Sequence, residues 1–242
     1  MTMEKIMLGI IGAMESEVSL LQSLLEEKVC RKVGKHTYYT GLLSGTPTVV
    51  ARAGVGKVNA AACTAAMILE FAPEFILNTG VAGALGKGVR VGDVIIADAC
   101  IEYDLEYGAL GDARGSIFYP DSTSEIVMPA DAELSLKLEE AAKAVSGGEF
   151  EVKRGIVATG DRFVSSNAAR NDILSAFPEA LCCEMEGAAI AQVCRLYSTK
   201  FSVLRSMSDS ADGEAEMDFP TFEKLSADRA ARIALSLAKS LS

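Results

Sequence analysis

Four acidic residues follow or interrupt apolar segments, at positions where their carboxyl groups could act as acids or bases. Glu17 follows the first apolar segment by about one helical turn, Asp209 follows the apolar stretch VLRSMS, and Glu184 and Glu186 bracket a methionine inside ALCCEMEGAAIA. A helix N-terminus favours the ionised form of a carboxylate, so Glu17 would be a ready base if it faced a ligand. Two glutamates inside an apolar run are costly to bury without partners. Each residue also has a structural interpretation, with Glu17 as a solvated first-turn glutamate and Asp209 as the N-cap of a short helix.

Histidine and cysteine offer little other chemistry. His36 is the single histidine in 242 residues, and it lies in the alternating segment HTYYTGLL, which is typical of a strand with a hydrogen-bonded histidine. A zinc site built on several histidines is therefore excluded, and any Ser-His-Asp or Cys-His device would have to use this one residue. The six cysteines form no C-x-x-C pair and mostly lie in apolar runs, which indicates buried thiols in a reducing compartment.

The charge balance excludes other classes of partner. The chain has 23 Lys+Arg and 33 Asp+Glu, a formal net charge of −10, so it presents no attractive field to a nucleic-acid backbone. No apolar stretch approaches the ~20 residues that cross a membrane. Half of the residues are apolar, which predicts a sizeable core. We therefore expect a cytoplasmic protein that binds a small molecule rather than nucleic acid or a membrane.

The elements that must position these residues alternate between buried strands and amphipathic helices. The segments predicted as strands are Ile6–Gly12, Val49–Ala53, Phe75–Thr79, Val94–Ala99, Gly155–Thr159, Leu181–Met185 and Phe201–Ser206. Helices are predicted to begin near Met14, Lys57, Asp131, Asn167, Glu186 and Thr221. This alternation, with several continuous apolar strands, predicts an α/β fold with a mixed or mainly parallel sheet covered on both faces. No linker or repeat divides the chain, so we expect one domain over residues 1–242.

Glycine-rich or polar segments follow four of the predicted strands. Gly54–Lys57 lacks the spacing of a phosphate loop and of a dinucleotide fingerprint, and is either a tight turn or a ligand-facing loop. Asn78–Gly83 is predicted to be a turn whose small residues let backbone N–H groups approach a ligand. Gly160–Phe163 and Ser208–Asp209 follow two further strands. Ligands collect at the carboxyl ends of strands in open α/β sheets, so these four segments could face one crevice.

One long segment breaks the alternation. Ile101–Pro129 is rich in Gly, Asp, Ser and Tyr and has no clear period. Nearly thirty residues are too many for an idle connection in a compact domain. We therefore expect this segment to cover a site or a subunit interface.

Seven segments closely resemble the 5′-methylthioadenosine/S-adenosylhomocysteine nucleosidases of the nucleoside phosphorylase/hydrolase superfamily. They are GIIGAMESEV (9–18), AGVGKVNAA (53–61), NTGVAGAL (78–85), VGDVIIAD (91–98), ATGDRFV (158–164), CEMEGAAIA (183–191) and RSMSDSAD (205–212). The resemblance runs in order from about residue 6 to the C-terminal helix, and the combination of GAMESEV, EMEGAA and SDSAD is specific. It implies a three-layer fold with a central mixed sheet, and a homodimer. It also implies hydrolysis of an N-glycosidic bond to adenine and a 5-thioribose product, without cofactor or metal.

The same resemblance assigns roles to residues of this chain. Glu17 would activate the attacking water, and Asp209 would protonate N7 of adenine with Ser208 helping to hold its carboxyl group. Glu186 would bind the ribose hydroxyls, and Met185 would pack on the ribose. The other expected substrate-binding residues are Phe163 stacked on adenine, Val164 with its backbone at the purine edge, Met14 and Phe219 near the sugar and alkylthio group, and Val81, Ala82, Gly83 and Glu184.

Three positions depart from the family pattern. Val81 stands where many members carry serine, and Arg162 stands where a small residue is common. Leu110 takes the place of an aromatic residue that reaches into the partner's site in many relatives. In a homodimer we therefore expect the Leu110 region to lie near the partner's site.

Other functions stay open on the sequence. A phosphorylase of the same fold would cradle phosphate with arginines, whereas GAMESEV is acidic, and Arg52 is the one residue that would favour phosphate. A related purine nucleosidase of the futalosine or 5′-deoxyadenosine type would keep the same acid. A binding protein without catalysis would not need both Glu17 and Asp209.

Overall fold

A computed structural model describes residues 7–212 and 215–242. The described helices are α1 (Glu15–Leu24), α2 (Lys57–Phe71), α3 (Ala132–Ser146), α4 (Asn167–Ala176), α5 (Gly187–Tyr197), α6 (Ala215–Ser240) and the short 3₁₀ helix η1 (Gly108–Leu110). The described strands are β1 (Leu8–Gly12), β2 (Glu26–Val33), β3 (His36–Leu43), β4 (Thr46–Arg52), β5 (Phe75–Ala84), β6 (Val94–Glu102), β7 (Ile117–Phe118), β8 (Ser124–Glu125), β9 (Met128–Pro129), β10 (Val152–Thr159), β11 (Ala180–Glu184) and β12 (Lys200–Asp209). None of these helices is long and apolar enough to span a membrane.

The central sheet is mixed, which confirms the predicted α/β class. Its strand order is β11-β10-β6-β12-β5-β1-β4-β3-β2, with β9 beside β6. β4, β1, β5 and β12 are parallel to one another, and β6, β10 and β11 form a second parallel set. β12 and β6 pair antiparallel where the two sets meet, and β2, β3 and β4 form an antiparallel meander. β11 pairs with β10 and also with the far end of β5, so β5, β12, β6, β10 and β11 are joined in a closed ring.

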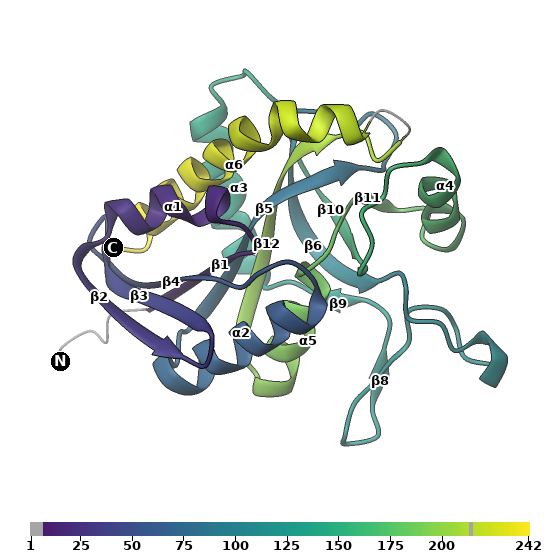
Figure 1. Cartoon of the computed structure of the whole chain (residues 1–242), viewed down its shortest axis with the longest axis horizontal. Coiled ribbons are helices and arrows are strands. Elements are labelled where there is room, and N and C mark those ends of the chain that lie inside the picture. The colour runs from purple at the N-terminus through teal and green to yellow at the C-terminus, as the bar shows by residue number, and fades with distance from the viewer. Residues whose placement is uncertain (1–6, 213–214) are drawn as a thin grey trace.

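Helices cover both faces of this sheet (Figure 1). Ile10, Leu77 and Leu204 point to the face that packs on α1, α3 and α6. Their neighbours in the chain, such as Ile11 and Ile76, point to the face that packs on α2 and α5. This alternation follows from the two-residue period of a strand, and burial of both faces explains why these strands are continuous apolar runs.

β5 corrects the prediction of a turn at Asn78–Gly83. The strand continues to Ala84 with every residue buried, because β12 pairs with it through Gly83 and β11 pairs with its last two residues. Glycine is needed here for close approach and not for turning. A Cβ at Gly80 would collide with Arg205 and Glu17, and one at Gly83 would lie 2.7 Å from an oxygen of Asp209.

Other elements differ less from the predictions. β2 was missed because it is an exposed, charged edge strand without alternation, and α6 begins six residues before the predicted Thr221. His36 opens β3, and its Nε2 lies 3.0 Å from the carbonyl oxygen of Ala53, which confirms the hydrogen-bonded strand histidine. Five cysteines are buried as expected, and Cys30 is exposed on β2.

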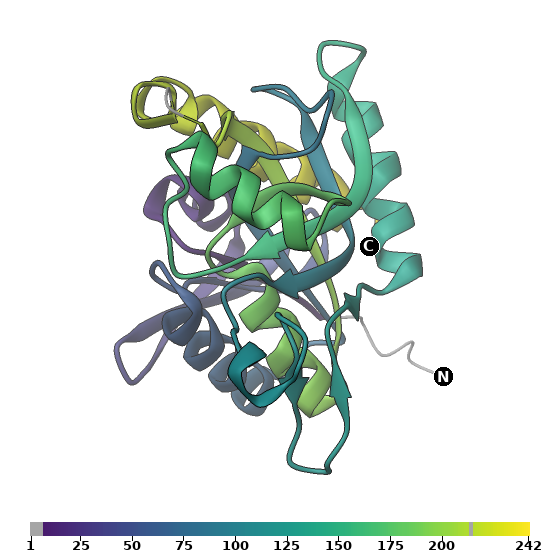
Figure 2. The ribbon, with the colours of Figure 1, turned by 90° about the vertical axis from the view of Figure 1, so that its right-hand side faces the viewer.

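The irregular segment after β6 extends away from the body of the fold (Figures 1 and 2). It contains η1 and a two-stranded arm formed by β7 and β8, and it returns to the sheet through β9. Leu110 in η1 is 79% exposed and Phe118 in β7 is also exposed. This irregular segment therefore exposes apolar side chains in both η1 and β7, as a segment that covers an interface would.

Candidate active site

A cavity of about 440 Å³ opens at the carboxyl ends of β1, β5, β10, β11 and β12. Every candidate site residue named from the sequence lines it. These residues are Met14, Glu17, Val81, Ala82, Gly83, Phe163, Val164, Glu184, Met185, Glu186, Ser208, Asp209 and Phe219. The prediction that several strand ends face one crevice is therefore confirmed.

The cavity has an acidic floor and an apolar mouth. Glu17, Glu186 and Asp209 are 2%, 5% and 2% exposed, whereas Phe163 at the mouth is 44% exposed. The rings of Phe163 and Phe219 meet edge to face with centroids 5.6 Å apart. Such a cavity suits an amphipathic ligand with a flat apolar part and several hydroxyl groups.

Glu17 is held by backbone N–H groups. Its Oε2 accepts hydrogen bonds from the amides of Ala13 (2.7 Å) and Met14 (2.9 Å), and its Oε1 accepts one from Val81 (3.0 Å). The solvated interpretation of Glu17 is therefore wrong. Burial raises the pKa of Glu17 above its ordinary value, although the charge of Arg205 and the three amides oppose this shift. A buried carboxylate with a raised pKa is a stronger base than a solvated one.

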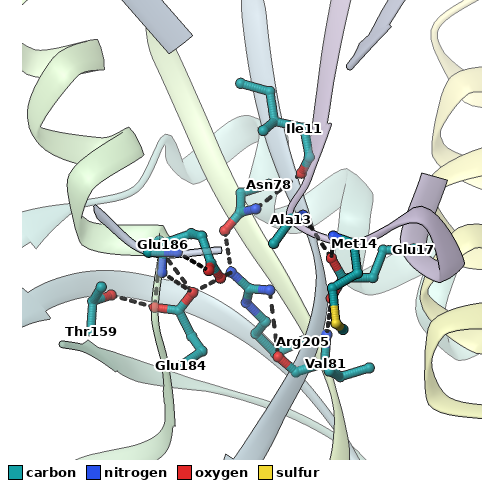
Figure 3. A network of polar contacts seen from close by, with 12 residues as sticks. Ile11, Ala13, Met14, Glu17, Asn78, Val81, Thr159, Glu184, Glu186 and Arg205 are labelled. Atoms are coloured by element: carbon teal, nitrogen blue, oxygen red, sulfur yellow. Dashed lines mark hydrogen bonds and ion pairs between the residues drawn. The ribbon is translucent and has the colours of Figure 1, made fainter. Parts of the chain in front are cut away.

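A buried arginine lies beneath the acidic floor (Figure 3). Arg205 is 1% exposed and pairs with Glu184, donates to Oδ1 of Asn78 at 2.5 Å, and lies 3.6 Å from Oε2 of Glu186. Asn78 in turn donates to the carbonyl oxygen of Ile11 at 3.0 Å, which ties the cluster to β1. Burial opposes the charge of Arg205, but Glu184, Glu186 and Glu17 raise its pKa above the ordinary value.

Glu184 and Glu186 have different surroundings. Glu184 accepts hydrogen bonds from Thr159 and from the amides of Glu186 and Gly187, in addition to its pair with Arg205. Its oxygens are thus engaged by the protein and fix the start of α5, and its substrate-binding role stays a prediction. Glu186 accepts a backbone hydrogen bond from the amide of Gly56 at 2.9 Å. Burial and the charge of Glu184 raise the pKa of Glu186 to about 7.

Asp209 is the last residue of β12, so it is not the N-cap considered above. Its Oδ2 accepts a hydrogen bond from the Ser208 hydroxyl and its Oδ1 accepts one from the amide of Ala211, both at 2.9 Å. The contact with Ser208 is the one expected from the sequence. These two donors help to fix the plane of the carboxyl group, which is almost fully buried.

Some residues near the cavity were not predicted as site residues. Ala13, Val55 and Cys183 line it, and Arg162 is the one cation among its described lining residues. Arg205 and Asn78 were not singled out, although a polar residue inside a buried apolar strand is a signal for a partnered group. Arg52, which could have favoured phosphate, does not line the cavity and pairs with Glu15 at 3.1 Å on the surface.

The arrangement can supply an acid and a base to one ligand without a metal. Glu17 comes from α1 and Asp209 from the end of β12, and both are buried at the same cavity. Among the described residues, no three His, Cys, Asp or Glu side chains are grouped in a way that could hold a metal ion. Because Glu17 and Asp209 are both buried at this cavity, the carboxyl groups of this site are equipped for acid–base chemistry.

Comparisons with known proteins find similar chains over almost the whole length described. The family model of the phosphorylase superfamily matches residues 7–239. The 5′-methylthioadenosine/S-adenosylhomocysteine nucleosidase of Staphylococcus aureus is 41% identical over 217 residues, which cover 89% of this chain and 92% of the relative. The corresponding Neisseria meningitidis enzyme, solved with methylthio-immucillin-A, has a TM-score of 0.91 and 39% identity and covers 97% of this chain and 99% of its own. The futalosine hydrolase of Helicobacter pylori has a TM-score of 0.86 and 32% identity, covering 97% and 98%.

The buried arginine gives a stability prediction. Replacing Arg205 by Met should lower the free energy of unfolding by about 3–5 kcal/mol, because it leaves buried carboxylates without their counter-charge. The matched control is Arg154→Met, which removes partly exposed ion pairs with Asp98 and Glu139 and should cost about 1 kcal/mol or less. Urea unfolding of the two variants measures the difference, and equal losses would contradict the account of Arg205.

Proposed function

Because the chain belongs to the phosphorylase superfamily and, within it, to the 5′-methylthioadenosine/S-adenosylhomocysteine nucleosidases, we propose that Asp209 and Glu17 carry the hydrolysis that defines this family. The reaction breaks the N-glycosidic bond of 5′-methylthioadenosine and S-adenosylhomocysteine and releases adenine and a 5-thioribose product. The observation that carries the proposal is the convergence of three buried carboxyl groups, Glu17, Glu186 and Asp209, in one cavity with an aromatic mouth.

The two carboxyl groups stabilise opposite ends of the transition state. As the glycosidic bond lengthens, negative charge develops on the purine and the ribosyl carbon becomes oxocarbenium-like. Asp209 donates a proton to N7 of the purine, so that neutral adenine leaves. Glu17 accepts a proton from the water whose oxygen bonds to the ribosyl carbon. The raised pKa of Glu17 fits this role, because it makes the carboxylate a better proton acceptor.

The other lining residues bind the parts of the substrate that do not react. Glu186 accepts hydrogen bonds from the ribose hydroxyls, and Met185 packs on the sugar. Phe163 stacks on adenine, and the backbone of Val164 reads the purine edge. Met14 and Phe219 line the alkylthio side. Val81, Ala82 and Gly83 of β5 complete the wall beside Glu17 and Asp209.

Water is favoured over phosphate as the nucleophile. The described floor residues are acidic, and a phosphate beside Glu17 would be repelled. Arg162 stands at the mouth, and Arg52 lies outside the cavity in a surface pair with Glu15. Neither guanidinium is placed to hold an anion next to the water-activating carboxylate.

We also propose the remaining properties implied by the resemblance. A homodimer in which the Leu110 region lies near the partner's site is supported by the exposed apolar side chains of Leu110, Phe118 and Val58. A cytoplasmic location is supported by the six free thiols. A single domain over residues 1–242 is supported by one sheet that draws strands from residue 8 to residue 209.

Product analysis tests the reaction itself. With 5′-methylthioadenosine in phosphate-free buffer, we expect the purified protein to release adenine and free methylthioribose, and added phosphate should not change the rate. Chromatography of the products decides between the alternatives. Cleavage that requires phosphate would indicate a phosphorylase. Cleavage of futalosine but not of methylthioadenosine would indicate the other nucleosidase class.

Substitution of the two carboxyl groups tests their roles. Asp209→Asn and Glu17→Gln should each lower kcat by about 10²–10⁴-fold, because an amide neither donates the proton to N7 nor accepts one from water. Adenine binding, measured by calorimetry, should survive in both variants. Asp131→Asn is the control, because this residue is the N-cap of α3 and does not line the cavity. Substantial turnover in either variant would contradict the proposed proton-transfer role of the substituted residue.

The pKa of Glu186 gives a pH prediction. Its ionised carboxylate accepts hydrogen bonds from ribose hydroxyls at both oxygens, more strongly than the protonated acid does, and the ionised fraction grows as pH rises through about 7. The affinity for a non-hydrolysable methylthioadenosine analogue should therefore rise by up to about tenfold per pH unit below this value and level off above it. Calorimetry at several pH values on both sides of 7 measures this affinity. Glu186→Gln should bind more weakly and without this rise, and an unchanged profile in that variant would contradict the assignment.

A further inference from the structure

The first residue of α2 breaks a general rule of helices. Lys57 places a positive charge at the positive end of the helix dipole, and the first turn of α2 has no acidic residue. Its side chain is nevertheless only 17% exposed, so the ammonium group is partly removed from water as well. Because a lysine at this position is unfavourable for the helix and costly to bury, we look to its neighbours for the interactions that offset these costs.

Lys57 closes a ring of polar contacts between three chain segments. Its Nζ lies 2.7 Å from Oδ1 of Asp104 and 3.0 Å from Oε2 of Glu102, at the end of β6. The other oxygen of Asp104 accepts a hydrogen bond from the amide of Asp161 at 2.8 Å. A carboxylate oxygen of Asp161 accepts one from the amide of Lys57, also at 2.8 Å. The ring therefore ties the start of α2 to the segments after β6 and β10.

Two of the chain segments that this ring joins continue into the wall of the cavity. Asp161 directly precedes Arg162, Phe163 and Val164, which line the mouth. On the other side, Gly56 directly precedes Lys57 and donates a hydrogen bond to Glu186 at 2.9 Å. Gly56 has a φ of +95°, and a Cβ there would lie 3.0 Å from the carboxylate of Asp161. The Gly56–Lys57 segment and the Asp161 segment therefore lie against each other.

The ring depends on the charge of Lys57. Glu102, Asp104 and Asp161 bring three carboxylates together, and Glu102 is 4% exposed. Their mutual repulsion is offset by the ammonium group, which lies within hydrogen-bond distance of two of them. A neutral side chain at position 57 would leave these carboxylates uncompensated and would open the ring at the contact with Asp104.

We propose that Lys57 is a positioning residue that holds the Phe163 segment and the Glu186 carboxylate in their ligand-binding geometry. This inference rests on the proposed function in naming adenine and ribose as the bound groups. Lys57 does not itself line the cavity. Its effect is therefore expected in substrate binding and not in the proton transfers made by Asp209 and Glu17.

The test compares Lys57→Met with Lys57→Arg and with a matched control. The control is Lys153→Met, which removes a similar Lys–Asp pair, 2.9 Å to Asp93, away from the cavity. We expect Lys57→Met to raise the KM for methylthioadenosine and the Kd for adenine by about tenfold, with kcat changed by less than about threefold. Lys57→Arg keeps the charge and should restore both constants. Lys153→Met should leave both unchanged at comparable stability.

Several outcomes would overturn the inference. It fails if Lys57→Met binds adenine as tightly as Lys153→Met does, if the loss appears in kcat alone, or if Lys57→Arg gives no rescue. Calorimetry of adenine binding needs no turnover. A wild-type protein that binds adenine without hydrolysing methylthioadenosine would thus refute the proposed function while the comparison of variants still decides the role of Lys57.

Discussion

The guanidinium group of Arg205, removed from water beneath the cavity, is the constraint on which the site depends. Its single positive charge interacts with three buried carboxylates at unequal distances. Glu184 lies in direct contact and Glu186 lies 3.6 Å away, and Glu17 also contributes to the raised pKa of Arg205. Glu184 makes the direct ion pair with Arg205 and also accepts hydrogen bonds from two amides at the start of α5. Glu186 is left with a pKa of about 7, and Glu17 with a raised pKa that backbone amides only partly offset. The charge of Arg205 lowers the pKa of both Glu17 and Glu186, but burial is the larger effect and leaves both raised.

The fold delivers these groups through strand ends and through glycine. β5 runs between β1 and β12 and carries Asn78, Gly80 and Gly83 past the cluster. Gly80 leaves space for Arg205 and Glu17, and Gly83 leaves space for Asp209. The pairing of β11 with the end of β5 brings Glu184 to the same place from the far side of the sheet. The acidic cavity is thus the product of a closed ring of strands and not of a flexible loop.

The sequence was a good guide to which residues gather and a poor guide to how they are held. Fold class, strand ends and the candidate residues follow from apolar periodicity, from the polar residues after each strand and from the family resemblance. The continuation of β5 could not be predicted, because Asn-Thr-Gly-Val-Ala-Gly has the composition of a turn and becomes a strand only through its two partners. β2 was invisible because an edge strand exposed on both sides needs no alternation. The division of labour between Glu184 and Glu186 depends on Arg205 and Thr159, which are distant in the chain.

The three hydrogen bonds to Glu17 all come from main-chain amides, at positions 13, 14 and 81. Main-chain donors are present whatever side chain a codon specifies, as long as proline is avoided and the local path of the chain is kept. The position of the Glu17 carboxylate therefore depends little on which side chains stand at the positions that hold it. At position 81, where the family resemblance leads us to expect serine, this chain has valine, and the main-chain amide of Val81 still donates to Glu17 at 3.0 Å.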